Sequence, residues 1–207
     1  MMRCIVVTAI AAASLTAAAC GSSSTNQAQP QRAAKTTTAT KAASARRLVL
    51  ARSDVPSDFR TVSSAPVTLA ETGPRLEPKF QQWGFVGGWS NVYGPQGSRR
   101  SSVLAVISIA HVFRTSTGAA HAFAEIKSVR RTIPVHLGDE GLFTMHRPTT
   151  VAGRKVARAI VGWRRRQVVS FVEVDGFAKS TVALRVALRT FVHKQDARVK
   201  RATGERS

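Results

Sequence analysis

A run of eleven residues constrains the fold of this chain more than any other segment. Residues 103–113 read VLAVISIAHVF, and apolar side chains occupy both alternating positions along the run. Successive side chains of a strand point to opposite faces of the sheet. A strand with apolar side chains at both odd and even positions is therefore expected to be covered on both faces. The run therefore predicts a central strand with further structure packed above and below it.

The rest of the folded part shows a regular order of strand and helix patterns. Further strands are predicted at residues 59–63, 82–93, 133–137, 142–146, 156–163 and 168–174. An amphipathic helix is predicted from Thr115 to about Arg131, because apolar residues recur there at helical spacing behind hydroxyl N-cap candidates. A last helix is predicted from Ser180 onward, and the prolines between residues 66 and 78 predict a loop. The order predicts an α+β fold, in which an antiparallel β-sheet has helices packed on it, within one domain over residues 45–207.

The N-terminus has the layout of a secretory signal peptide over residues 1–19. One cation, Arg3, precedes an apolar stretch that is interrupted by hydroxyl side chains and then gives way to small residues. A membrane span would need about 20 apolar residues in succession. The segment LTAAAC, which ends at Cys20, resembles the lipobox of bacterial lipoproteins. This resemblance implies that Cys20 is the lipidated first residue of the mature chain and that the protein is anchored outside the cytoplasm.

A second interpretation of the same segment stays open. Ala17 occupies the position where a lipobox usually has leucine, and the three alanines before Cys20 also suit a signal peptidase that releases a secreted protein. Residues 20–44 contain almost no apolar side chain larger than alanine, so they predict a flexible tether. About 24 residues of such a chain have a root-mean-square reach of roughly 25–30 Å.

The amino-acid composition limits which partners this protein can bind and which reactions its side chains can carry out. Both cysteines, Cys4 and Cys20, lie in the signal region, so the folded part has no thiol for a disulfide or for thiolate chemistry. The formal net charge of +20 favours anionic partners, either anionic lipids or cell-wall polymers. Export makes nucleic acid the least suitable anionic partner. A merely solvated arginine surface explains the charge equally well.

No motif predicts catalysis, a cofactor or a metal site. The five histidines show no metal-ligand spacing, and no P-loop or dinucleotide fingerprint is present. The segment Gly88-Trp89-Ser90-Asn91 lacks the second glycine of a hydrolase nucleophile elbow. We therefore expect a protein that is not an enzyme and that needs no cofactor. An envelope hydrolase, the third alternative, would require polar groups to converge near Ser90, His111 or Glu140.

Two groups of residues are candidates for ligand binding. Aromatic residues occupy odd-numbered positions between 83 and 93, so on an unbroken strand they would point to one face of the sheet. A bulge at Gly87-Gly88 would break this pattern. Such a face either packs in the core or stacks on a ligand. A run of arginines falls at a predicted hairpin tip, where we expect solvation. The candidate residues are Trp83, Trp89, Tyr93, Arg164, Arg165 and Arg166.

Three segments together resemble secreted and lipoprotein domains of actinobacteria. They are LVLARSDVPSDF at residues 48–59, VFRTSTGAAHAF with LGDEG between residues 112 and 141, and GWRRRQVVSFVEVDG with ALRTFVHKQDARVKR between residues 162 and 201. The resemblance implies an architecture of the PsbP-like or mycobacterial sensor-lipoprotein type and brings no catalytic residues. The expected function is a lipid-anchored envelope protein that binds a ligand or another envelope protein. The alternative is a secreted basic protein that docks on anionic lipid or cell-wall polymer.

Overall fold

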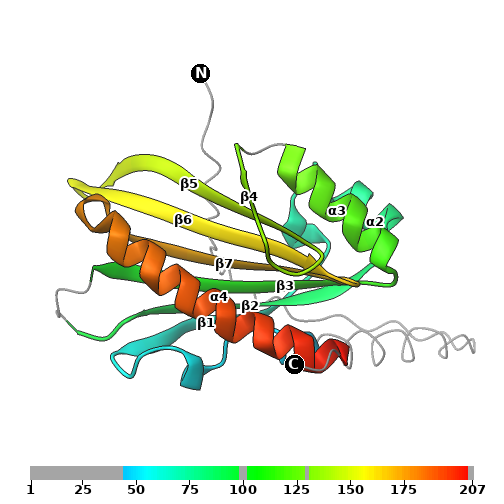
Figure 1. The fold of residues 1–207 in the computed structure, drawn as a ribbon, viewed down its shortest axis with the longest axis horizontal. Coiled ribbons are helices and arrows are strands. Elements are labelled where there is room, and N and C mark those ends of the chain that lie inside the picture. Colours follow the sequence, from blue (N-terminus) through cyan, green and yellow to red (C-terminus); the bar gives the residue numbers. More distant parts are fainter. Residues whose placement is uncertain (1–43, 98–101, 129–130, 205–207) are drawn as a thin grey trace, which may run out of the picture.

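The computed structural model describes residues 44–97, 102–128 and 131–204, which form one antiparallel sheet with helices packed on it (Figure 1). The signal peptide, Cys20 and all of the predicted tether except Ser44 lie outside the described residues. The seven strands have the order β1-β2-β3-β7-β6-β5-β4, and each neighbouring pair is antiparallel. The predicted α+β class is confirmed.

The elements follow the predicted order of strands, helix, four strands and helix. The strands are β1 (Phe59–Val67), β2 (Phe85–Pro95), β3 (Val103–Phe113), β4 (Ile133–Val135), β5 (Glu140–Val151), β6 (Arg154–Arg165) and β7 (Val168–Phe177). The helices are α2 (Glu77–Gln82), α3 (Ser116–Ser128) and α4 (Thr181–Thr203), with 3₁₀ turns η1 (Arg52–Asp54), η2 (Ala70–Thr72) and η3 (Ala178–Ser180).

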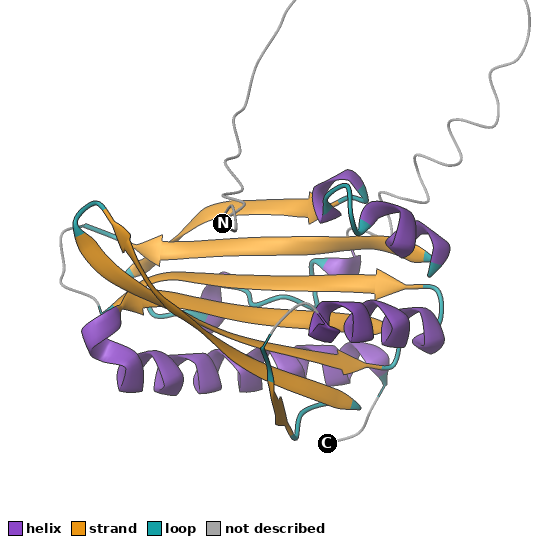
Figure 2. Cartoon of the chain, turned by 90° about the horizontal axis from the view of Figure 1, so that it is seen from above, coloured by secondary structure: helices purple, strands orange, loops and turns teal. Residues whose placement is uncertain are grey.

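The two faces of the sheet are covered unequally. The long helix α4 lies along one face, where it contacts β3, β6 and β7 (Figure 2). The shorter helices α2 and α3 pack at one end of the other face, around Phe80, Phe113 and Phe123. Because these two helices are short, a large part of that second face is left without a helix.

This unequal coverage corrects one expectation for the central strand. On β3, Val106, Ser108 and Ala110 are buried on the α4 side, as predicted. On the opposite side Ile107 and Ile109 are only half-buried and line an open cleft. The strand is therefore central in the sheet but is fully covered on one face only.

The predicted loop at residues 66–78 is also wrong in part. Strand β1 continues through Pro66 to Val67, which the sheet tolerates because β1 is an edge strand. The following residues form η2 and α2, and Pro78 lies in the first turn of α2, where its missing N–H costs no helical hydrogen bond. Short regular elements thus occupy most of the segment that the prolines marked as a loop.

A buried polar network fixes α4 to the sheet. The Ser108 hydroxyl on β3 donates to Gln195 Oε1 at 2.7 Å, and Gln195 Nε2 donates to the carbonyl of Ile109 at 3.0 Å. The backbone N–H of Leu50 donates to Ser108 Oγ at 2.8 Å, while Tyr93 donates its hydroxyl to the Leu50 carbonyl at 2.7 Å. The network ties the N-terminal segment, the sheet and α4 together, and the side chains of Tyr93, Ser108 and Gln195 in it are at most 1% exposed.

A buried ion pair adds a second connection between α4 and the sheet. Arg165, near the end of β6, donates from Nε and Nη2 to Asp196 at 3.1 Å, and both residues are buried. Arg164 donates to Asp139 at 2.7 Å, and Asp139 also accepts the backbone N–H of Arg166. The hairpin end was predicted to be solvated, and for Arg165 this is wrong, because the C-terminal half of α4 covers it.

We predict that Asp196→Ala lowers the free energy of unfolding by about 3–5 kcal/mol, because it leaves the Arg165 charge buried without its carboxylate partner. Lys127→Ala is the matched control, since it removes one partner of an exposed ion pair with Glu140, and it should cost at most about 1 kcal/mol. Urea unfolding monitored by circular dichroism measures both. Equal effects of the two substitutions would show that the Arg165–Asp196 pair is not buried in solution.

Candidate functional site

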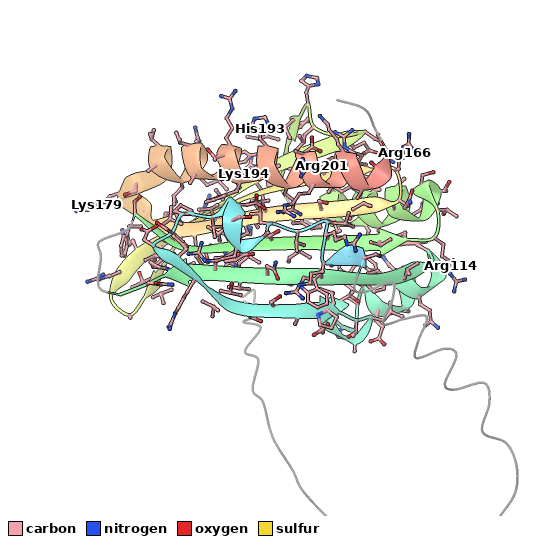
Figure 3. All side chains as sticks on the ribbon, turned by 90° about the horizontal axis from the view of Figure 1, so that it is seen from below. Arg114, Arg166, Lys179, His193, Lys194 and Arg201 are labelled. Atoms are coloured by element: carbon pink, nitrogen blue, oxygen red, sulfur yellow. The ribbon has the colours of Figure 1, made fainter. Side chains whose placement is uncertain are left out.

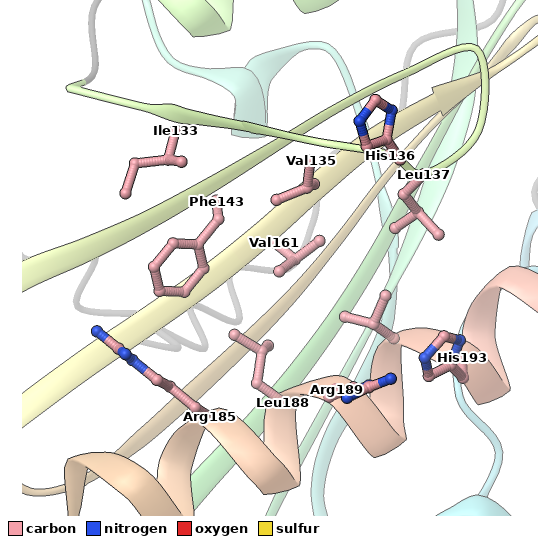
Figure 4. A pocket seen from close by; sticks show the side chains of 11 residues that line it. Ile133, Val135, His136, Leu137, Phe143, Val161, Arg185, Leu188, Arg189 and His193 are labelled. Carbon is pink, nitrogen blue, oxygen red and sulfur yellow. The ribbon is translucent and has the colours of Figure 1, made fainter.

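A groove of about 470 Å³ lies between α4 and the β4–β5 edge of the sheet (Figure 4). Its walls are apolar side chains from β4, β5, β6 and α4, and its edge carries arginine and histidine side chains. We call it the α4 groove. The apolar residues are Ile133, Val135, Leu137, Phe143, Val161, Leu188 and Val192, and the polar ones are His136, Arg185, Arg189 and His193.

A second hollow of about 630 Å³ adjoins the α4 groove and shares Ile133, Phe143 and Arg185 with it. It adds two more cations, Arg131 and Arg147. In the part of the chain that the structure describes, no aspartate or glutamate lines either hollow. The two hollows together form a trough lined by apolar and cationic side chains. A third hollow shares Val135, His136 and Leu137 with the α4 groove and is lined by Asp139 and Glu140, both of which form ion pairs.

The spacing of residues on α4 produces this arrangement. Arg185, Leu188, Arg189 and Val192 recur at helical spacing, so they lie along one side of the helix. Leu188 and Val192 are buried toward the sheet, while the Arg185 guanidinium lies 6.0 Å from the centroid of the Phe143 ring. Among the described residues no carboxylate forms an ion pair with Arg185 or Arg189. Both guanidiniums are thus available to an anionic group.

The apolar walls and the guanidiniums indicate which kind of molecule fits the α4 groove. An apolar wall favours an aliphatic chain, and each buried methylene contributes about 0.8 kcal/mol. A guanidinium presents a planar fork of donors that matches a carboxylate or a phosphate. The arrangement therefore suits a molecule with an apolar chain and an anionic head.

The opposite face of the sheet carries a different cavity, which we call the sheet-face cleft. Its volume is about 560 Å³, and its floor includes Ile107, Ile109 and Phe171. Two acids line it, and each has a partner: Glu71 accepts the Thr68 backbone N–H at 2.6 Å, and Glu173 pairs with Arg158 at 2.9 Å. No lysine or arginine is among the described residues that line this cleft. The two cavities are therefore electrostatically unlike.

His111 lies in the wall of the sheet-face cleft. Its ring is 5.7 Å from the centroids of Phe80 and Phe85 and 6.1 Å from that of Phe171. Its buried Nδ1 has no hydrogen-bond partner among the described residues. Burial in this aromatic surrounding lowers the pKa of His111 from 6.5 to about 4, so the imidazole is neutral at pH 7.

The hydrolase alternative requires polar groups to converge near Ser90, His111 or Glu140, and the sheet-face cleft contains Ser90 and His111 together with Ser63, Glu71 and Glu173. Glu140 does not line this cleft. Glu140 instead pairs with Lys127 at 3.3 Å and with Arg164 at 3.5 Å. Among the described residues, no group of three or more histidine, cysteine or acidic side chains could hold a metal ion.

The predicted aromatic face is not formed as one surface. Trp83 ends α2 and stacks on His121 at 5.9 Å, whereas Tyr93 is 1% exposed in the core. Trp89 donates its indole N–H to Asn91 Oδ1 at 3.0 Å and lies under the Arg46 guanidinium. The pairing of β2 with β3 shifts its register between Phe85 and Gly87, so the residues before and after this bulge differ in parity.

The candidate arginines also have roles within the fold. Arg164 and Arg165 are held by Asp139 and Asp196, and Arg166 donates to the Thr203 carbonyl at 3.2 Å. A ligand-binding role for these three arginines, and for Trp83, Trp89 and Tyr93, stays a prediction. Sequence reasoning missed the α4 groove; the signal that could have indicated its helical wall is the spacing of Arg185 and Arg189, one turn apart and next to Leu184 and Leu188.

Comparisons with known proteins give little further constraint. No family model matches the chain, and no curated protein matches it. Among solved structures it is similar to the extracellular domain of PknH from Mycobacterium tuberculosis, with a TM-score of 0.42 and 13% identity, over 72% of this chain and 93% of that chain. This is a loose fit to a mycobacterial extracellular domain. No helix among the described residues is long and apolar enough to cross a membrane.

We predict that His111 makes stability depend on pH. Its pKa is about 4 in the folded protein and near 6.5 when unfolded, so between these values the unfolded chain binds the extra proton. The free energy of unfolding should fall as pH falls from 6.5 to 4, by at most about 3 kcal/mol, and this loss should level off below pH 4. His111→Phe should remove this component, whereas His193→Gln, at an exposed position, should retain it. Parallel pH profiles of denaturant unfolding for wild type and His111→Phe would contradict the assignment.

Proposed function

We propose that this protein is a lipid-anchored envelope protein whose folded part binds an anionic amphiphile in the α4 groove and catalyses no reaction. The observation that carries the proposal is the pairing of an apolar trough with two guanidiniums, Arg185 and Arg189, that have no carboxylate partner among the described residues. The ligand class is a molecule with an aliphatic chain and a carboxylate or phosphate head.

The size of the α4 groove supports this class of ligand. Its volume of about 470 Å³ lies within the usual range of small-molecule sites, which is roughly 300–1,000 Å³. Burying six methylenes there contributes roughly 5 kcal/mol, part of which is offset by the entropy lost on association. The aliphatic chain of the ligand alone would therefore bind weakly. Contacts to its head group would provide the remaining affinity and the selectivity for an anionic ligand.

The position of the head follows from the positions of the cations. Arg185 and Arg189 stand one turn apart on α4, at the edge of the trough rather than at its floor. A head at that edge stays hydrated while its chain enters between Phe143 and Leu188. Charge-assisted hydrogen bonds of this kind contribute about 1.5–3 kcal/mol each when they are well formed.

Anchoring is the second part of the proposal and is supported by the lipobox-like segment that ends at Cys20. The described chain begins at Ser44, which lines a hollow together with Arg47, Arg198 and Arg201 at the C-terminal end of α4. A tether that joins the domain there leaves the groove, beside the N-terminal half of α4, free of the attachment point.

The ligand is tested by Arg185→Gln/Arg189→Gln, measured by calorimetry with decanoate and with uncharged decanol. Removing both cations should weaken decanoate binding about tenfold or more, which corresponds to about 1.4 kcal/mol. Decanol binding should change less than twofold, because the apolar wall is retained. The matched control is Arg60→Gln/Lys155→Gln, which removes two exposed cations that do not line the groove. Equal weakening in both variants, or equal effects on acid and alcohol, would overturn the ligand assignment.

The anchor is tested by Cys20→Ala in the full chain, followed by fractionation of cells and medium. We expect the substituted protein to leave the membrane fraction, because it lacks the thiol that would carry the lipid. Cys4→Ala should remain with the membranes, since Cys4 lies within the predicted signal peptide. A Cys20→Ala protein that stays as membrane-bound as wild type would refute lipidation at this position.

A further inference from the structure

Exposed apolar side chains gather around the α4 groove. Five large apolar side chains are strongly exposed among the described residues; Ile133 lines this groove, and Val182 and Val186 lie on α4, the helix that forms one of its walls. Ile133 on its β4 wall is 61% exposed, while Val182 and Val186 on α4 are 76% and 63% exposed. Single exposed apolar residues need no explanation, but a cluster beside a cavity does.

Helix geometry places the two valines next to the groove. Val182 and Val186 are one turn apart, so they lie on the same side of α4. Arg185 and Arg189 are one and three residues from Val186, and each is displaced from the valines toward the groove. The exposed valines thus form an outer border along the helical wall, and Ile133 forms the border on the sheet side.

Cations surround the same opening. Arg185 and Arg189 line the groove, Arg131 and Arg147 line the adjoining hollow, and Lys179 lies just before α4. Figure 3 shows Lys179 at one end of α4 and Lys194 and Arg201 further along it. Asp139 and Glu140 line a third hollow next to the groove, but Arg164 and Lys127 pair with them. A surface that combines exposed apolar side chains with an excess of cations fits the interface of an anionic bilayer.

We propose that this rim, formed by Ile133, Val182 and Val186 with Arg185, Arg189 and Lys179, docks on an anionic membrane surface. The proposal rests on the proposed function, because docking would open the α4 groove onto the lipids from which its amphiphile comes. The valines and Ile133 enter the boundary between head groups and acyl chains, and the cations contact anionic head groups.

The exposed apolar side chains of the rim favour a bilayer over the other possible partners. A cell-wall polymer has charge but no apolar layer, so it would leave the three aliphatic side chains in water. A second copy of this chain would bring two strongly cationic surfaces together, which electrostatic repulsion opposes. A bilayer accommodates both kinds of side chain, with about 1 kcal/mol per cation from the anionic surface and further energy from the buried apolar area.

The predicted tether allows this contact in the anchored protein. Helix α4 has 23 residues and is therefore about 34 Å long. The described N-terminal end lies at the C-terminal end of this helix, whereas the rim lies along its N-terminal half. The separation along the helix is thus about 18–29 Å, which is within the reach of the tether.

The test uses the chain from Gly21 onward, which keeps every residue of the described fold and omits the lipid anchor. It is co-sedimented with vesicles of phosphatidylcholine alone or with about one third phosphatidylglycerol. Wild type should prefer the anionic vesicles. Val182→Asp/Val186→Asp should weaken this binding at least tenfold, because it places carboxylates where aliphatic side chains enter the bilayer. The matched control Thr61→Asp/Val62→Asp adds two charges on β1, at the opposite edge of the sheet, and should change binding less than threefold.

A second readout reports insertion directly. The protein has three tryptophans of its own, so the wild-type emission is subtracted from that of Val186→Trp. The difference spectrum should shift to the blue when anionic vesicles are added and should not shift with a soluble polyanion such as heparin. Equal weakening by the two aspartate pairs, or a Val186→Trp spectrum that does not respond to vesicles, would overturn docking through this rim. Decanoate binding in solution, measured on Val182→Asp/Val186→Asp, separates the two proposals. A variant that keeps decanoate binding but loses vesicle binding supports docking through the rim. A wild-type protein that binds no decanoate would refute the groove ligand and leave the docking proposal unaffected.

Discussion

Buried polar contacts fix the position of α4 on the sheet, and the groove beside this helix follows from that position. Two consecutive polar residues of this helix, Gln195 and Asp196, point into the protein and find partners on β3 and β6. Buried polar groups of this kind are costly unless they are paired, so they disfavour any shift of the helix along or around its axis. The α4 groove exists because the same helix, held at its C-terminal half, passes beside the β4–β5 edge.

The distribution of charge follows from a shortage of acids. The chain has 31 lysines and arginines but only 11 aspartates and glutamates, so most cations have no partner of opposite sign. The acids that the structure describes are largely engaged in internal ion pairs, as Asp139, Glu173 and Asp196 show. Positive charge is thus unavoidable on this surface. The informative observation is its location, beside an apolar trough on one face and absent from the described lining of the cleft on the other.

The sequence predicted those parts of the fold that depend on local periodicity. The β3 run, helix α3 and helix α4 each have a regular apolar pattern, and their positions agree with the structure. For the aromatic residues the sequence left two outcomes open, and the structure has the one with a bulge at Gly87, so the side chains before and after it lie on opposite faces of the sheet. The burial of Arg165 was missed because it depends on a partner 31 residues further along the chain. The groove was missed for the same reason, since its walls come from four elements that are spread along the chain between Ile133 and His193.

In the proposed function, the α4 groove and not the sheet-face cleft takes the aliphatic chain of an anionic amphiphile. A methyl NMR spectrum recorded with a fatty acid that carries a spin label on its chain tests this directly. We predict strong broadening of the Leu188, Val192 and Val161 methyl signals, which line the groove, while the signals of Ile107 and Ile109 stay sharp. Broadening confined to Ile107 and Ile109 would place the ligand on the opposite face of the sheet and contradict the account.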